Sequence, residues 1–361
     1  MRLLDRYVLF VFLRVFLVAL VSFGVLLVAI DFFGRLGYFL DADRVDGTFA
    51  EGYSTTRRVF LFYAVYVPFL LQQVLPFVTV SAGLFSVAHM LHGNEVAPVV
   101  AAGTSVRRLF LPLFAAGLLV SVGHVAFQQF LVPALSKEQM AIKRFFSADQ
   151  TGVRDPPHIR DGRGTVTRAS WYGFSDGALT SVVVQRPWQT GGFEIWKAPR
   201  LEPLGDHWRA PEGVEIQPPG VDSLPRRMPE GAEVDIGVAP DDVDALVTKR
   251  GIAGLSLSQL KGLVDRFPGR RHLRVALHKQ VARPLASFAM LLLGVPLLLG
   301  AGRAYFAGGA LAFALSMAYY FLDIFFTSLG DRGDLPPFLA AYSPLALLLS
   351  LGVARLSTVT T

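Results

Sequence analysis

Glu95 is the carboxylate whose surroundings most favour binding to another molecule. It lies in the polar connection 89–108 between two apolar runs, ahead of Gly103 and the basic pair Arg107 and Arg108. This pattern predicts a short surface helix with an acidic start and a glycine stop. A carboxylate there can pair with an arginine of a partner protein, or it can cap its own helix, which stabilises by about 0.3–1 kcal/mol. The pattern favours neither alternative.

Asp323 is an acidic residue inside the apolar run 304–328. Because a charge at the bilayer centre costs about 2.5–3.5 kcal/mol, we expect this side chain to face a protein interface or a polar cavity rather than lipid. Asp331 follows it, and two such aspartates suggest an intramembrane aspartyl protease. The neighbours do not fit that class, since no tyrosine precedes Asp323 and Asp331 is expected in a loop beyond the helix.

Most of the common catalytic motifs are missing from the sequence. It has no GxxxxGK[ST] loop and none of its six lysines follows a glycine, so any ATP-driven work must use a partner subunit. HExxH is also missing, which removes the commonest metalloprotease signal, whereas GxSxG occurs once, at residues 173–177. With no cysteine, the chain has no disulfide, thiolate metal site or cysteine nucleophile.

The composition indicates a membrane protein. Of the 361 residues, 52% are apolar and 17% charged, and the mean hydropathy is +0.46. A net charge of +6 raises nucleic acid as a partner in a soluble protein. In a chain with several membrane spans, arginines at helix ends instead meet lipid phosphates, so we expect no nucleic acid.

Six apolar runs are long enough to cross a bilayer or nearly so. They lie at 7–30, 60–90, 109–132, 284–299, 304–328 and 338–356. The first is longer than the core of a signal peptide and lacks a small-x-small cleavage site, so we expect it to be retained. Basic residues of the connections and termini divide six against five between the two sides, too evenly to fix the orientation. We favour both termini inside.

Residues 145–250, between the two triplets of runs, have the composition of an aqueous domain. Glycine, proline and charge become frequent, and all four tryptophans fall here. Alternating stretches broken by turn residues predict antiparallel strands in a sandwich or open barrel. These stretches are 165–168, 179–185, 193–197 and 213–217, and the proline-rich stretch 218–229 is expected to be a surface loop. Ser256 and Gln259 then form a capping-box pattern before a short helix that links this domain to the next span.

A series of motifs along nearly the whole chain resembles the LptF/LptG (YjgP/YjgQ) family of lipopolysaccharide export permeases. They are Leu4-Asp5-Arg6-Tyr7, Leu75-Pro76-Phe77, the segment from Asn94-Glu95 to Arg107-Arg108-Leu109, Val132-Pro133-Ala134, the stretch 255–260, Leu277-His278-Lys279, and the stretches 282–286 and 293–297. The segment around Glu95 aligns without gaps to the family's coupling segment. The set is specific, although no single motif is decisive.

The resemblance implies an α-helical integral membrane protein of the bacterial inner membrane. Six transmembrane helices, three before and three after, flank an inserted all-β, jellyroll-like periplasmic domain. Residues 1–144 then hold the first three spans and a cytoplasmic coupling helix around 93–103, residues 145–250 the β-domain, and residues 251–361 a linker helix and the last three spans.

The family also implies partners. A second permease of the same type, in a heterodimer or a homodimer, encloses a cavity that takes lipopolysaccharide or a related lipid from the outer leaflet, through gates formed by the first and fifth spans. A cytoplasmic ABC ATPase dimer binds ATP and Mg, so this chain holds no cofactor or metal and is not an enzyme. The jellyroll continues into a periplasmic bridge protein that leads toward the outer membrane.

Site residues follow from the same resemblance. Glu95 is the first candidate for the ATPase contact, together with Asn94, Val99, Gly103 and Arg107. For the substrate cavity the candidates are Arg35, Asp31, Asp323 and Arg57. Asp31 occupies a position where some family members carry a basic residue, so Arg35, one turn later, is the substitute, and Arg57 and Arg58 are weaker candidates.

Two departures and two alternatives accompany this interpretation. Pro98 lies within the coupling helix, where proline is tolerated only in the first turn, so the helix is expected to begin at Asn94 or to be distorted. The β-domain is the part least similar to the family.

A membrane-anchored scaffold whose β-domain binds an envelope partner is the main alternative function. A self-sufficient secondary transporter is less favoured, because paired broken helices and a repeat signal are missing.

Overall fold

The computed structural model describes residues 3–36, 55–135, 152–174, 176–188, 191–220, 224–247, 252, 255–300 and 305–358. The chain divides into two compact units. Residues 1–37, 59–132 and 274–361 form the helical unit, and residues 38–58 and 133–273 form the β-unit.

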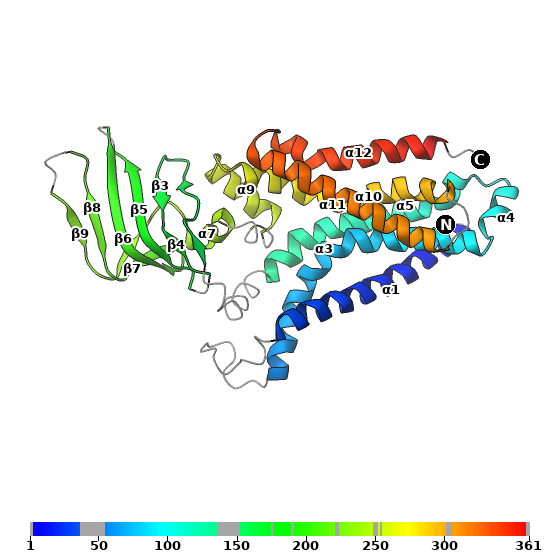
Figure 1. The fold of residues 1–361 in the computed structure, drawn as a ribbon, viewed down its shortest axis with the longest axis horizontal. Coiled ribbons are helices and arrows are strands. Elements are labelled where there is room, and N and C mark those ends of the chain that lie inside the picture. The colour runs from blue at the N-terminus through cyan, green and yellow to red at the C-terminus, as the bar shows by residue number, and fades with distance from the viewer. Residues whose placement is uncertain are drawn as a thin grey trace. The chain divides into compact units, whose positions relative to one another are not determined.

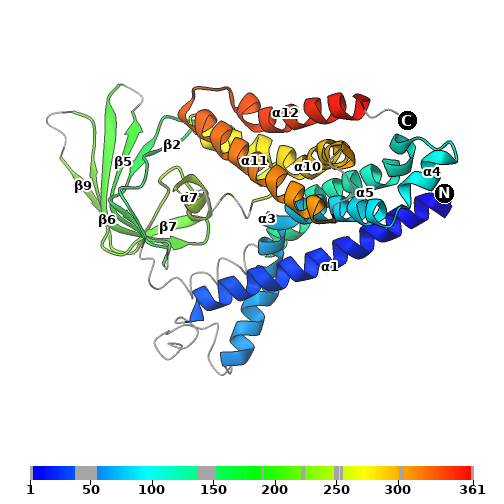
Figure 2. The ribbon, with the colours of Figure 1, turned by 45° about the vertical axis from the view of Figure 1, so that its right-hand side comes forward.

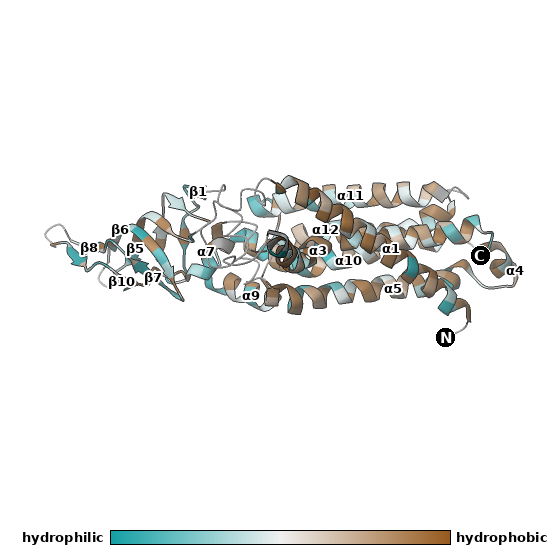
Figure 3. Cartoon of the chain, turned by 90° about the horizontal axis from the view of Figure 1, so that it is seen from below, coloured by the Kyte–Doolittle hydropathy of each residue, from teal (hydrophilic) through white to brown (hydrophobic). Residues whose placement is uncertain are grey.

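Six long helices match the six predicted spans (Figure 1). They are α1 (Leu3–Gly34), α3 (Thr55–His92), α5 (Val106–Ala126) with its π-helical continuation η2 (Phe127–Leu131), α10 (Arg271–Gly300), α11 (Tyr305–Arg332) and α12 (Pro337–Thr358). Most of their residues are apolar (Figure 3). The predicted architecture, three spans on each side of an inserted antiparallel β-domain, is confirmed.

The centre of the helical unit is formed by α3 and α10, whose spanning stretches are 67% and 72% buried. Small residues allow the close approach that helix packing in a membrane requires. A Cβ atom on Gly83 or Gly117 would lie 2.2 or 2.5 Å from a methyl carbon of Leu291, so these glycines make room for that side chain. In contrast, only 6% of the spanning stretch of α1 is buried, and α1 lies at the edge of the unit (Figure 2).

The β-unit holds ten described strands, all paired antiparallel. They are β1 (Val153–Arg154), β2 (Ile159–Arg160), β3 (Val166–Arg168), β4 (Trp171–Tyr172), β5 (Leu179–Pro187), β6 (Phe193–Leu204), β7 (His207–Ala210), β8 (Val214–Gln217), β9 (Arg226–Met228) and β10 (Ala232–Val234). The four predicted strands correspond to β3, β5, β6 and β8. The remaining strands are two to four residues long, too short to show alternation.

Strand β6 organises the sheet. It is 12 residues long and pairs with β5 from Phe193 to Leu201. Its first half also pairs with β8, and its last residues pair with β7. β9 continues beyond β8, and β10 beyond β7. The buried indole of Trp208 on β7 donates a hydrogen bond of 2.7 Å to the carbonyl of Val238, so the core of this unit holds a fixed aromatic side chain.

Two predictions for the β-unit are wrong in part. β9 lies inside the stretch expected to be a loop, because its three residues pair with β8 and the flanking Pro225 and Pro229 stay outside the ladder. The domain expected to be all-β also contains the helix α7 (Pro240–Val247). Proline as first residue and two aspartates in the first turn favour that helix start.

The predicted capping box at the start of α9 (Leu257–Arg266) is confirmed. The Ser256 hydroxyl accepts from the amide of Gln259 at 3.2 Å, and the Gln259 side chain accepts from the amide of Ser256 at 2.9 Å. α9 lies near α7, where Arg266 and Asp242 approach to 2.6 Å. Burial raises the pKa of the Asp242 carboxyl, and the nearby Arg266 offsets this only in part.

Candidate functional site

The connection between α3 and α5 holds the short helix α4 (Val96–Ala101), and we call residues 93–105 the α4 turn. The expectation that the helix begins at Asn94 is wrong, because Asn94 has a left-handed backbone (φ 56°) and the helix starts at Val96. Pro98 is therefore the third helical residue and lies in the first turn, where its missing amide leaves no hydrogen bond unmade. Gly103, with φ 86°, ends the turn in a conformation that favours glycine.

Glu95 occupies the N-cap position of α4, as the capping alternative expects, but its side chain makes no capping hydrogen bond. Its carboxylate instead accepts a hydrogen bond of 2.8 Å from the hydroxyl of Tyr7 on α1. Nearby, Arg108 of α5 forms an ion pair of 3.1 Å with Asp5 of α1. The first turns of α1 are thus tied to both ends of the α4 turn.

The other coupling candidates have different surroundings. Asn94 and Gly103 are exposed, and Val99 is half-buried against the core of the helical unit. Arg107 donates a hydrogen bond of 2.7 Å to the carbonyl of Ser357 in the last turn of α12. The surface of the turn also carries a mostly apolar hollow of about 450 Å³, lined by Leu91, Asn94, Val96, Ala97, Val100 and Ala101.

The two termini and α4 lie at one end of the helical unit (Figures 1 and 2). This is the arrangement that an even number of spans requires when α4 connects the second span to the third. The α4 turn and the two chain ends therefore lie on the same side of the membrane.

A second candidate region lies at the far end of α1. Asp31 and Arg35 form an ion pair of 2.9 Å, and Asp31 also accepts from the Tyr63 hydroxyl at 3.0 Å. The Arg35 guanidinium lies over the rings of Phe62 and Tyr66, 5.5 and 5.3 Å from their centroids. The pair is thus fixed between α1 and α3 by charge, hydrogen bonding and aromatic contact.

An apolar groove between α1 and α3 adjoins this pair. It has a volume of about 570 Å³ and is lined by Leu20, Val21, Gly24, Val25, Val28, Ala29, Phe32, Phe33, Val67 and Leu71. Its lining holds no charged side chain, so it suits an acyl chain. Asp31 lies between the lining residues Ala29 and Phe32, and Arg35 lies two residues after Phe33, so the polar pair is at the end of the groove.

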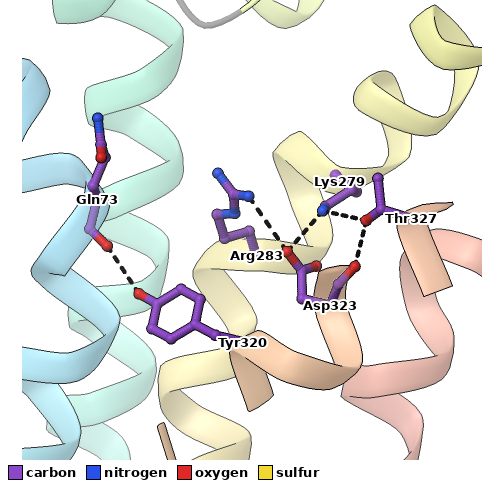
Figure 4. Close-up of polar contacts among 6 residues, drawn as sticks. All are labelled: Gln73, Lys279, Arg283, Tyr320, Asp323 and Thr327. Atoms are coloured by element: carbon purple, nitrogen blue, oxygen red, sulfur yellow. Dashed lines mark hydrogen bonds and ion pairs between the residues drawn. The ribbon is translucent and has the colours of Figure 1, made fainter. Parts of the chain in front are cut away.

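Asp323 is the centre of a third region, shown in Figure 4. It is 4% exposed, so the expectation that it avoids lipid is confirmed. Lys279 of α10 lies 2.7 Å from Asp323 Oδ2 and donates to the hydroxyl of Thr327 at 2.6 Å. Arg283, one turn later on α10, approaches the same oxygen at 3.4 Å. We call Lys279, Arg283 and Asp323 the charge cluster.

Asp331 is in the last turn of α11 and not in a loop, which corrects that expectation. The two aspartates are eight residues apart on one helix, a rise of about 12 Å. An aspartyl protease needs two carboxylates that share a proton at about 3 Å. Asp323 is paired with lysine instead, so the geometry does not fit a protease.

Sequence reasoning missed Tyr7, Lys279 and Arg283 as site residues. Lys279 and Arg283 are four residues apart and share one helix face, which would have predicted a paired role for them. Nothing local to Tyr7 points to Glu95, which lies 88 residues away. Arg57 is exposed in the first turn of α3, and the side chain of Arg58 lies outside the described residues.

The family comparison covers nearly the whole chain. Residues 6–358 match the family model described as Lipopolysaccharide export system permease LptF/LptG. The match begins in the first turn of α1, includes the β-unit and ends at the last residue of α12. No curated protein matches the chain. Among the described residues, no group of three or more histidine, aspartate or glutamate side chains is placed to hold a metal.

Proposed function

Because this chain belongs to the LptF/LptG family of lipopolysaccharide export permeases, we propose that it forms half of a path that takes lipopolysaccharide, or a related lipid, out of the inner membrane. The family match over residues 6–358 carries this proposal. The chain is a multi-pass inner-membrane protein, and the ATPase of the transporter is a separate subunit. The second permease is a paralogue or a second copy of this chain, and the β-unit meets a periplasmic bridge protein.

The α4 turn is the proposed contact with the ATPase. Glu95 is half-buried and its side chain makes no capping hydrogen bond to α4, so the oxygen that does not bind Tyr7 can accept from an arginine of the ATPase. The neighbouring hollow of about 450 Å³, which Asn94 lines, receives an apolar side chain of the same partner. Gly103 shapes the turn, while Val99 and Arg107 hold it against the helical unit.

A displacement of the α4 turn by the ATPase is transmitted directly to α1. The Tyr7 hydroxyl and the ATPase share the carboxylate of Glu95, and the Asp5–Arg108 ion pair lies beside them. Val8 and Phe12, in the turns of α1 that follow, are buried in the core of the helical unit. A displacement of the α4 turn therefore displaces the first three turns of α1 with it.

The lipid is proposed to lie along α1 and α3. An acyl chain fits the apolar groove, and Asp31 and Arg35 meet its polar end. The outer face of α1 is also apolar and exposed, as at Phe10, Val18 and Val25, which suits contact with lipid or with the second permease. Asp323 and Arg57 remain candidates for the cavity wall.

The test uses the permease purified with its partner subunits. Glu95→Gln should lower the affinity for the ATPase by about 30-fold, the lower end of the loss for one member of a buried charge pair, about 2 kcal/mol. Glu212→Gln, which makes the same change at an exposed position of the β-unit, should leave it unchanged. A scaffold would recruit no ATPase and would respond to neither variant.

Topology gives a second test. The natural chain has no cysteine, so Ala102→Cys, exposed at the end of α4, provides a single reactive thiol. A membrane-impermeant maleimide should label it only when the cytoplasmic face is accessible. Labelling in intact cells from the periplasmic side would reject the ATPase contact.

A further inference from the structure

The charge cluster between α10 and α11 carries more positive than negative charge. Lys279 and Arg283 both approach the same oxygen of Asp323, so two cations share one carboxylate. The charge of Asp331 also acts on Lys279, but from two turns farther along α11. Charge away from water is costly unless it is paired and hydrogen-bonded. The cluster therefore has room for one further anion.

Arg283 is the cation with open positions. Lys279 is nearly covered and has two short contacts, at 2.7 and 2.6 Å. Arg283 carries five N–H donors. Its contact with Asp323 is long, 3.4 Å, and its Nε is buried without a hydrogen-bond partner among the described residues. Its side chain is 43% exposed, so a ligand has access to it.

Polar side chains from several helices surround Arg283. Figure 4 shows its guanidinium on the side of Asp323 that faces Tyr320, whose hydroxyl donates to the carbonyl of Gln73 on α3 at 2.9 Å. The buried His124 of α5 lies within range of the charge of Arg283. It contacts Gln128 at 3.4 Å, and the buried Oε1 of Gln128 has no described partner. Unpaired polar atoms thus gather where four helices meet, beside the π-helical turn η2, a feature frequent at functional sites.

The level of Arg283 in the membrane identifies the ligand. It directly precedes the apolar run 284–299 of α10, and Asp323 lies in the last third of α11. Both positions lie toward the end of the helical unit where α10 begins and α11 ends. Asp323 is inside its own apolar run, but Arg283 is next to the edge of the run 284–299, so its long side chain reaches the boundary between headgroups and acyl chains. The acidic group present at that boundary is the phosphate of a lipid headgroup, and guanidinium binds phosphate with two parallel hydrogen bonds.

We propose that Arg283 binds the phosphate of a lipid headgroup, with Asp323 and Lys279 as positioning residues. Asp323 holds the guanidinium from one side and leaves its other donors for the phosphate. This site deepens the proposed function and rests on it for the identity of the lipid. It is separate in sequence from Asp31 and Arg35 and lies on different helices.

The test measures lipid binding to the full complex in detergent by native mass spectrometry. The probes are bisphosphorylated lipid A, dephosphorylated lipid A and dioleoyl phosphatidylglycerol. Arg283→Gln should weaken binding of the phosphorylated lipid A at least tenfold and leave the dephosphorylated form within twofold of wild type. Arg283→Lys keeps the charge but loses the paired hydrogen bonds, and should weaken binding three- to fivefold. Arg274→Gln, the same charge change at an exposed position of α10, should have less than a twofold effect.

The probes distinguish the source of the phosphate. If Arg283→Gln loses affinity for phosphorylated lipid A alone, the site belongs to the exported lipid. If it loses affinity for phosphatidylglycerol as well, the site binds headgroup phosphate in general. Unchanged affinity in Arg283→Gln, or an equal loss in Arg274→Gln or with dephosphorylated lipid A, overturns the proposal. If Arg283→Gln does not assemble with the ATPase, unchanged affinity in Arg283→Lys overturns it.

ATP-dependent lipid release, measured on the wild-type complex, separates the two proposals. A complex that releases lipopolysaccharide but binds it independently of Arg283 keeps the proposed function and rejects this site. A complex that binds phosphorylated lipids through Arg283 but releases none on ATP hydrolysis keeps the site and rejects the function.

Discussion

Removal of either partner from the Lys279–Asp323 pair should have unequal effects on stability. Asp323→Leu leaves Lys279 buried without a carboxylate in contact, and loss of one partner of a buried pair costs about 3–5 kcal/mol. Lys279→Met leaves Asp323 with Arg283 at 3.4 Å, so its cost should be smaller, about 1–3 kcal/mol. The double variant removes both buried charges and leaves only the partly exposed Arg283 without its contact to Asp323, so its stability should return to within about 1 kcal/mol of wild type.

The assay is reversible unfolding of the helical unit in mixed micelles, followed by far-ultraviolet circular dichroism. The two single variants and the double variant form a double-mutant cycle, in which a coupled pair gives a large interaction term. Thr327→Val, which removes the second contact of Lys279 and keeps the ion pair, is the matched control and should cost about 1 kcal/mol. Additive effects of the two single variants, or a larger loss for Lys279→Met than for Asp323→Leu, would refute the reasoning.

Three further predictions concern other parts of the chain. Tyr7→Phe removes the hydrogen bond to Glu95, about 1 kcal/mol, and should lower lipid release per ATP hydrolysed several-fold without loss of the ATPase; wild-type coupling would contradict the route through α1. Gly352→Val should destabilise by about 1–3 kcal/mol, since a Cβ there lies 3.0 Å from the backbone of α10, whereas Gly123→Val, with open space around it, should cost less in the same unfolding assay. Because burial raises the pKa of Asp242, the stability that this carboxyl contributes is complete below its unfolded value, roughly 3.9, and is lost as pH rises through the folded pKa; Asp242→Asn should flatten that fall in thermal unfolding followed by tryptophan fluorescence.

The features that sequence predicted correctly depend on local pattern. Hydropathy located all six spans, and the three-residue spacing of Ser256 and Gln259 located the start of α9. Alternation located β5 and β6, which are long enough to display it.

The features that sequence missed depend on pairing between distant segments. β9 has only three residues and owes its conformation to β8. Glu95 has the composition of a helix cap, yet its partner is Tyr7, and the choice between these depends on how α1 packs beside the α4 turn. Asp323 was expected to avoid lipid, but its partner Lys279, 44 residues away, could not be inferred from α11 alone.

The polar contacts of α1 lie near its two ends, and this makes a swinging motion cheap. Its first turns are fixed by Glu95 and Arg108, while near its far end the Tyr63 hydroxyl holds Asp31, with the apolar groove between. About 28 residues separate Tyr7 from Arg35, roughly 42 Å along the axis, so a rotation of about 10° around the fixed end would carry Arg35 through an arc of about 7 Å. Such a rotation breaks few polar contacts and widens the groove at the end where a headgroup would sit. If the α4 turn rotates α1 in this way, a small displacement there produces a larger one beside the groove where we propose that the lipid lies.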